Sequence, residues 1–208
     1  MKTLFFTAAA ALIASQACAS GLTTEVMLGS PAKAKTGVNY TEYKVNYSTH
    51  APLLEGFNVG TEVTLKQLDN NGAVSGKVSG RLEYPVAPVL GVEPTVYGEY
   101  GEALSQKVTT VVGKTTTVTG ENYQFWGAGA KASYAVTVVP GLNATAGVRY
   151  RASIGARKDV TETRLNVGAS YDVLKDTAVG LQYYRVNNKL GTVTTDANVV
   201  AATLGFKF

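Results

Sequence analysis

Hydrophobic and polar residues alternate with a period of two along most of the chain after residue 20. This alternation is typical of β-strands with one apolar and one polar face, and no helical period is convincing in this region. Short turn segments such as Asp69-Asn70-Asn71-Gly72 separate the alternating stretches. The pattern predicts ten strands, at approximately 21–29, 38–49, 56–68, 73–84, 94–103, 121–136, 141–154, 161–172, 176–187 and 196–208.

The two faces of these strands differ in charge. One face is uncharged and includes Val59, Val78, Val148, Leu165 and Leu181. A charge that faces lipid at mid-membrane costs about 2–4 kcal/mol, so the uncharged face is suited to contact lipid. A soluble sandwich would show the same alternation with its apolar faces inside, and the alternation alone leaves both folds open. The opposite face carries Glu25, Glu42, Lys44, Glu62, Lys66, Lys77, Arg81, Glu83, Glu99, Lys131, Arg149, Arg151, Glu162 and Arg164.

The last strand remains apolar to the end of the chain. Every second residue is apolar from Val200 through Ala202, Leu204 and Phe206 to Phe208. Because chain ends usually fray, this pattern indicates a terminus that is held in the structure. It resembles the outer-membrane β-barrel proteins of Gram-negative bacteria, whose final strand has this alternation and a terminal Phe. The resemblance extends to porin-like and OmpA- or OmpX-like barrels without selecting one family, and it implies that the barrel-assembly machinery recognises Phe206 and Phe208.

The amino terminus has the features of a secretory signal. Lys2 precedes an apolar run from Leu4 to Ala14, and Ala17-Cys18-Ala19 forms a small-x-small cleavage site. This interpretation divides the chain into a signal peptide at 1–19 and a single domain at 20–208, exported to the outer membrane. A lipoprotein with Cys18 as its acylated residue is the alternative, but Ser15 stands where that motif needs Leu. The signal and the terminal Phe favour the barrel over the soluble sandwich.

Composition narrows the function further. Cleavage would remove the only cysteine and Lys2, leaving 18 basic and 15 acidic residues and a net charge of +3. That charge is too close to neutral to indicate a nucleic-acid partner. The mature chain would have no disulfide and no thiolate metal site. The mean hydropathy of the full 208-residue chain, +0.03, suits a barrel, which averages an apolar face with a polar one.

The predicted fold is an all-β, antiparallel, up-and-down transmembrane β-barrel of ten strands. An eight-stranded barrel, with 21–29 or 94–103 outside the wall, is the alternative. If the terminal Phe faces the periplasm, the periplasmic connections are 50–55, 85–93, 137–140 and 173–175, and the outer connections are 30–37, 69–72, 104–120, 155–160 and 188–195. Valine and threonine residues around Gly113-Lys114 predict a projecting β-hairpin within the longest outer connection.

Two functions fit such a barrel. The first is a narrow porin-like channel for small solutes or ions, with slight anion preference, because eight basic residues face six glutamates. The second is a non-conducting barrel in which these charges pair, and whose outer loops act as an adhesin or receptor. Outer-membrane lipid and the assembly machinery are the expected partners. The residues predicted to line the lumen are Glu62, Lys66, Lys77, Arg81, Glu83, Glu99, Lys131, Arg149, Arg151, Glu162 and Arg164.

Enzymatic function is not predicted. His50 is the single histidine, and it lies in a predicted turn where no catalytic triad can be assembled around it. The segment Val112-Gly113-Lys114-Thr115 lacks the first Gly of a phosphate-binding loop, because Val108 occupies that position. No carboxylate and histidine residues have metal-ligand spacing, so neither a metal nor a cofactor is predicted.

Overall fold

A computed structural model describes residues 21–31, 39–50, 56–68, 74–105, 108–112, 115–119, 122–155 and 159–207. The predicted signal peptide at 1–19 and Phe208 lie outside the described residues. Within these ranges, no helix is long and apolar enough to cross a membrane.

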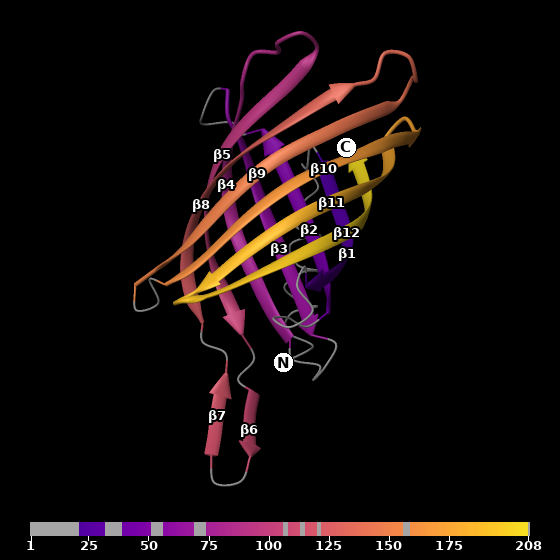
Figure 1. Ribbon diagram of the computed structural model, residues 1–208. Coiled ribbons are helices and arrows are strands. Elements are labelled where there is room, and N and C mark those ends of the chain that lie inside the picture. The colour runs from indigo at the N-terminus through magenta and orange to yellow at the C-terminus, as the bar shows by residue number, and fades with distance from the viewer. Residues whose placement is uncertain are drawn as a thin grey trace.

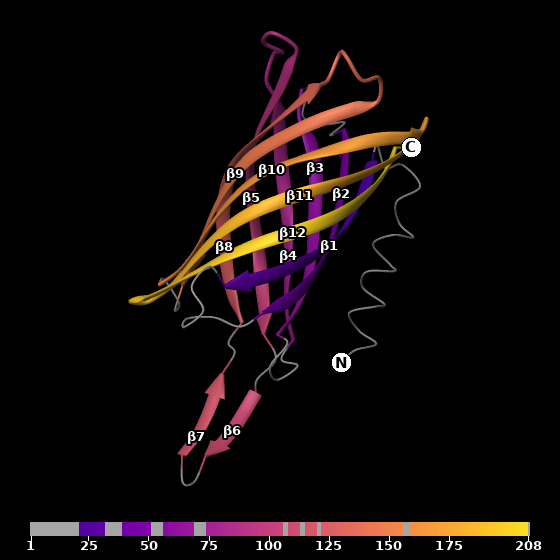
Figure 2. The ribbon, with the colours of Figure 1, turned by 45° about the vertical axis from the view of Figure 1, so that its right-hand side comes forward.

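Ten of the described strands form one closed antiparallel barrel (Figures 1 and 2). Their order around the wall is β1-β12-β11-β10-β9-β8-β5-β4-β3-β2. This confirms the up-and-down barrel of ten strands. The eight-stranded alternative is wrong, because β1 and β5 each pair with a neighbour on both sides. The barrel strands are β1 (Gly21–Pro31), β2 (Tyr40–His50), β3 (Asn58–Leu68), β4 (Val74–Pro85), β5 (Val92–Ser105), β8 (Tyr123–Ala135), β9 (Leu142–Ile154), β10 (Val160–Leu174), β11 (Thr177–Leu190) and β12 (Val193–Lys207).

The strands are staggered around the ring. Paired residues lead from Met27 through β12, β11, β10, β9 and β8 to Glu93 on β5. In the other direction they lead from Met27 through β2, β3 and β4 to Ser105 on the same strand. The ring therefore closes with an offset from residue 93 to residue 105. Barrels with an offset of this kind have strands that tilt by about 35–45° from the barrel axis. In small barrels of about eight strands, side chains nearly fill the interior.

The connections divide between the two ends of the barrel as predicted. We call the end that carries the paired residues Gly21 and Lys207 the terminal end, and the opposite end the loop end. Because neighbouring strands are antiparallel, the connections after β2, β4, β8 and β10 lie at the terminal end. Those after β1, β3, β5, β9 and β11 lie at the loop end.

The proline-rich connection between β4 and β5 is more ordered than the sequence suggests. The Val86 amide donates to the Pro94 carbonyl at 2.8 Å, and the amides of Val89 and Val92 each donate to the other residue's carbonyl at 3.0 and 2.9 Å. Leu90 and Gly91 between them both have positive φ, 52° and 80°. Positive φ at both central residues is characteristic of a type I′ turn, so this segment is a β-hairpin extension instead of a long loop.

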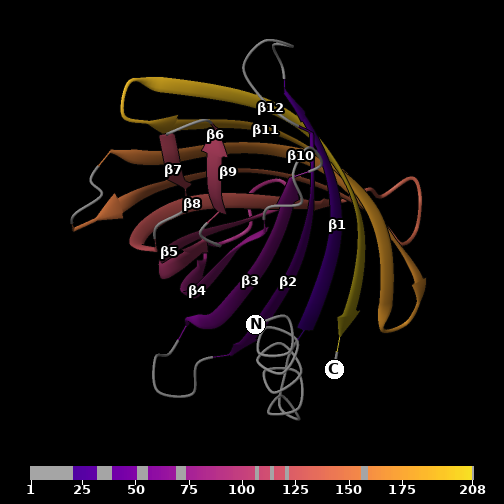
Figure 3. The ribbon, with the colours of Figure 1, turned by 90° about the horizontal axis from the view of Figure 1, so that it is seen from below.

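The predicted hairpin in the longest loop-end connection is confirmed. β6 (Val108–Val112) and β7 (Thr115–Thr119) pair residue by residue in an antiparallel sheet of their own. Figures 1 and 2 show this hairpin extending away from the barrel, and Figure 3 views the molecule from that side.

The uncharged strand faces point outward. Leu165, Val167 and Leu181 are among the most exposed apolar residues of the wall, with 51%, 56% and 65% of their surface accessible. Residues of the opposite parity, such as Met27, are buried inside the ring. Since exposed side chains of a barrel wall can face only the surroundings, the wall presents an apolar outer surface.

Candidate functional site in the barrel interior

The charged strand faces meet inside the barrel. All six glutamates of this face are buried, as are Lys44, Arg149, Arg151 and Arg164. Arg81 is nearly buried, whereas the side chains of Lys77 and Lys131 are 29% and 50% accessible. Lys66 has an intermediate exposure. The structure therefore brings together the residues that the sequence assigned to the lumen, and it places Lys77 and Lys131 toward opposite ends.

Glu62 on β3 is the centre of the ionic network. Its carboxylate accepts hydrogen bonds from Arg149 at 2.9 Å, Arg151 at 2.8 Å and Arg81 at 3.0 Å. Arg149 and Arg151 belong to β9, which three strands separate from β3 around the wall. The contact from Glu62 to β9 therefore crosses the lumen. A buried carboxylate needs such partners, because its desolvation is otherwise uncompensated.

Two further glutamates extend the network. Glu99 on β5 accepts two hydrogen bonds from Arg151, at 2.7 and 2.8 Å. Glu162 on β10 binds Arg149 at 2.9 Å and Lys77 at 2.5 Å. Five strands of the wall thus share one set of ion pairs. A paired arginine uses several of its five N–H donors at once, which fixes the position of its guanidinium group.

A second bridge crosses the lumen elsewhere. Arg164 on β10 donates to Glu42 on β2 at 3.2 Å, and again three strands separate the two along the wall. Toward the terminal end, Lys131 binds Glu83 at 2.9 Å. Two ion bridges, Glu62–Arg149 and Glu42–Arg164, therefore cross the lumen.

Another part of the interior is apolar. Side chains from β1, β2, β11 and β12 form a buried cluster around the seam where the first and last strands pair. Glu25 lies at its border, where it binds Lys44 at 2.7 Å and accepts a hydrogen bond from the Tyr184 hydroxyl. We call this group the seam cluster; it consists of Met27, Tyr40, Tyr184, Val186, Ala197, Val199 and Ala201.

The seam cluster was missed by the sequence reasoning. Only one apolar face was assigned to the last strand, and that face holds Val200, Ala202 and Leu204. A signal was present, because Val199 to Ala202 is an unbroken apolar run in which both faces of the strand are apolar. Such a run is typical of a strand that is buried on one side and in lipid on the other.

Some donors of the interior are incompletely paired. Among the described residues, the buried Nε atoms of Arg81, Arg149 and Arg164 have no hydrogen-bond partner. Lys66 makes no ion pair with any described residue, and its ammonium group lies 3.5 Å from the centre of the Tyr40 ring. A cation over an aromatic face is stabilised by the ring quadrupole. The network is therefore dense but not saturated.

A recess near the loop end, bordered by Lys77, Tyr123, Arg151 and Ser153, has a volume of about 10 Å³. A cavity needs about that volume to hold a single water molecule. Within the described part of the chain, no group of three or more His, Cys, Asp or Glu side chains could hold a metal ion.

Comparison with protein-family models finds no match, and comparison with curated protein sequences finds none either. Several solved structures are similar. The β domain of the Bordetella autotransporter BrkA aligns with 92% of this chain and 100% of its own, at 6% identity and a TM-score of 0.57. The translocator domain of the autotransporter NalP from Neisseria meningitidis aligns with 97% of both chains, at 11% identity and a TM-score of 0.52.

A third structure, of Neisserial surface protein A, aligns with 90% of this chain and 95% of its own, at 10% identity and a TM-score of 0.42. At such identities a likeness shows the fold alone. The chain has the fold of outer-membrane β-barrels.

Proposed function

We propose that the protein is an integral outer-membrane β-barrel that is closed to solutes in this conformation and acts through its loop end. The observation that carries this proposal is that ion pairs cross the lumen. The Glu62–Arg149 and Glu42–Arg164 bridges cross the lumen, and the seam cluster packs beside Arg164, which contacts Met27 and Tyr184. Wide aqueous channels need about 16 strands, whereas this barrel has ten.

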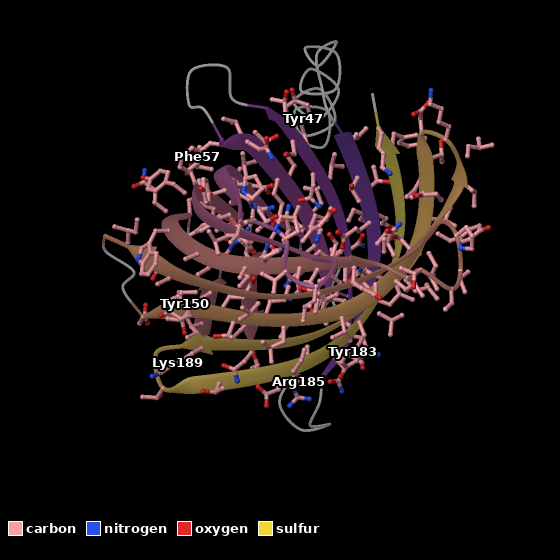
Figure 4. The ribbon with its side chains drawn as sticks, turned by 90° about the horizontal axis from the view of Figure 1, so that it is seen from above. Tyr47, Phe57, Tyr150, Tyr183, Arg185 and Lys189 are labelled. Atoms are coloured by element: carbon pink, nitrogen blue, oxygen red, sulfur yellow. The ribbon has the colours of Figure 1, made fainter. Side chains whose placement is uncertain are left out.

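The outer wall supports a membrane location. Aromatic side chains lie near both margins of the apolar surface, where their rings suit the boundary between acyl chains and headgroups. At the terminal end, Phe57 and Tyr84 have ring centres 5.1 Å apart. Toward the loop end, Trp126 and Tyr150 lie 5.8 Å apart. Figure 4 shows Tyr47, Phe57, Tyr150 and Tyr183 at the periphery of the barrel.

Fractionation tests this location. We expect the protein in the outer-membrane fraction, with faster gel migration in detergent before heating than after, because a folded barrel is more compact than its unfolded chain. A protein recovered in the soluble periplasm would contradict the proposal.

The β6–β7 hairpin is the proposed interaction element. Among the strands that the structure describes, β6 and β7 pair only with each other, so their outer edges present backbone groups that no other described strand pairs. An extended segment of a partner can add to such an edge as a further strand. Deleting 106–119 tests this role, and a second variant with a scrambled segment of the same length and composition tests whether the order of residues in the hairpin is needed. We expect adhesion to host surfaces or phage sensitivity to fall in both variants, and unchanged values would contradict it.

A narrow channel gated by the ionic network is the second candidate function. It is favoured by the incompletely paired arginines and by the partly exposed Lys77 and Lys131 toward opposite ends of the lumen. With eight basic residues against six glutamates, a pore opened here would prefer anions. The network, held by side chains alone, could rearrange without breaking the wall.

Planar-bilayer conductance of the refolded protein separates the two candidates. For the closed barrel, we expect no conductance across a range of salt concentrations. A steady conductance of the unmodified protein would contradict the closed barrel and support the channel. Glu62→Gln removes the negative charge that three arginines share, and conductance that appears only in this variant would indicate a gate. Glu102→Gln is the control, because Glu102 lies on the outward face of β5.

A further inference from the structure

The outward faces of the barrel strands carry few charges, and most of them are in one place. Among the outward-facing residues that the structure describes on these strands, only Glu102, Arg185, Lys189 and Asp196 are charged. The last three lie on the neighbouring strands β11 and β12, in their loop-end halves. A charge on a lipid-facing wall is costly unless it lies near the interface, so its placement needs an explanation.

These residues form a continuous polar strip. Arg185 pairs with Asn198 in the β11–β12 register, and Asn187 pairs with Asp196. Toward the terminal end the same outward positions become apolar, beginning at Val200 on β12. Figure 4 shows Tyr183, Arg185 and Lys189 at the periphery of the barrel. We call this group the outer strip; it consists of Tyr183, Arg185, Asn187, Lys189, Asp196 and Asn198.

The strip lies where the apolar wall ends. Tyr183 marks the boundary, with Leu181 on its terminal-end side and Arg185 on its loop-end side. Because an amphipathic tyrosine suits the membrane interface, Arg185 and Lys189 are at the level of lipid headgroups. The neighbouring strand has uncharged threonines, Thr161 and Thr163, at its outward loop-end positions. The positive charge therefore belongs to one sector of the wall.

The cations of the strip retain unused donors. Arg185 donates to Asn198 at 2.9 Å and to Asp196 at 3.1 Å, which uses two of its five N–H groups. Its side chain is 43% accessible. Lys189 is exposed and makes no ion pair with any residue that the structure describes. A guanidinium with free donors is suited to bind phosphate oxygens, and an ammonium group adds a second positive charge.

We propose that the outer strip binds the phosphate groups of an outer-leaflet lipid, with one phosphate at Arg185 and another at Lys189. The two residues are four positions apart on one strand, or about 13 Å along it, a separation that suits a lipid bearing two phosphates. Asp196 competes with the lipid for Arg185 in this arrangement. The inference rests on the proposed location of the barrel in the outer membrane.

Lipid retention by the purified barrel tests this site. The probe is diphosphoryl lipid A in detergent, and its complex with the barrel is measured by native mass spectrometry. We expect the double variant Arg185→Gln/Lys189→Gln to lower the affinity at least tenfold, since each lost charged contact weakens binding substantially. Lys175→Gln, which removes an exposed cation from a turn at the terminal end, is the matched control and should leave affinity unchanged.

Asp196→Asn separates binding from a structural role of the ion pair. Freed from its competitor, Arg185 should hold lipid A more tightly. If the pair only stabilises the wall, the variant would lose stability with no gain in lipid affinity, and the inference would be overturned. Heat-modifiable migration of every variant shows whether its barrel is folded.

Two controls on the ligand complete the experiment. Dephosphorylated lipid A should bind much less tightly, and equal binding would overturn the role of phosphate. Millimolar inorganic phosphate should displace lipid A only weakly, and displacement at low concentration would indicate an anion site that does not select lipid. If the barrel is in the outer membrane but retains lipids without selecting phosphate, only the lipid-binding inference is contradicted. If the protein is soluble in the periplasm, the proposed function is contradicted.

Discussion

At Leu90 the backbone adopts a left-handed conformation, which no other described residue except glycine does. Its φ of 52° is needed because Leu90 and Gly91 together turn the chain between β4 and β5. For a residue with a Cβ atom, this conformation costs about 1–2 kcal/mol. Leu90 gains no packing in return, since it is 95% accessible. Burial of the Leu90 side chain among the described residues therefore does not offset its backbone strain.

Leu90→Asn should stabilise the barrel by about 0.5–1 kcal/mol, because Asn-Gly is the preferred pair for a type I′ turn. Urea unfolding of the refolded protein measures the change. Leu174→Asn is the matched control, as Leu174 is another exposed leucine, at the end of β10 next to a turn, with an ordinary φ. A gain of the same size in the control would attribute the effect to lost surface hydrophobicity instead of backbone strain.

The strand positions could be predicted from the sequence, whereas some strand ends could not. The period of two predicted all ten barrel strands, and most of the predicted ends lie within a few residues of the observed ones. The last strand starts at Val193, three residues before the predicted start at 196. The prediction missed these residues because the outward positions Thr194 and Asp196 are polar and do not continue the apolar alternation. The hairpin extension after Pro85 lies in the segment 85–93, which was predicted only as a periplasmic connection, and its prolines give no strand signal.

The sequence could not predict which charged residues pair with each other inside the lumen. Alternation shows that Glu62 and Arg149 share the inward parity, but they are 87 residues apart, and only the closure of the staggered ring brings them together. The same holds for Glu42 and Arg164. The pattern thus identified the charged face, whereas the bridges depend on the tilt and the offset of the strands.

A lysine in the middle of β11 tests whether this strand faces lipid. Leu181→Lys should cost about 2 kcal/mol when the protein is folded into lipid vesicles, because the ammonium group would lie on the apolar part of the wall, on the terminal-end side of Tyr183. Thr194→Lys, on the outward face of β12 near the loop end, should cost only about 0–1 kcal/mol, since the penalty falls toward the interface. Denaturant unfolding in vesicles gives both values, and equal costs would argue against a depth-dependent lipid contact.

In the whole molecule, wall and hairpin are separate units of pairing. The barrel is closed by its own ten strands, and β6 and β7 form a second sheet with no backbone pairing to it. The two cross-lumen bridges, in contrast, join strands that are not neighbours. Stability is therefore concentrated in the wall and its interior, and the projecting hairpin can vary without affecting either.

Deletion of 106–119 should leave the thermal unfolding midpoint of the barrel within a few degrees of the original. The physical reason is that the deleted residues contribute no strand to the ring. Circular dichroism of the detergent-solubilised protein on heating measures this, with heat-modifiable migration as a check on folding. A large fall in the midpoint would show that the hairpin supports the barrel, and the proposed division would be wrong.

The pairing of β1 with β12 has a consequence for how the molecule is made. These strands come from opposite ends of the described chain, yet they pair along eleven consecutive positions from Gly21 to Pro31. Contacts between such distant segments form late and slowly in folding, because a long intervening chain must first be ordered. Until β12 arrives, β1 and β11 each expose an open strand edge that invites aggregation. A chain arrested before residue 193 would therefore be an incomplete ring, dependent on chaperones to keep it from self-association.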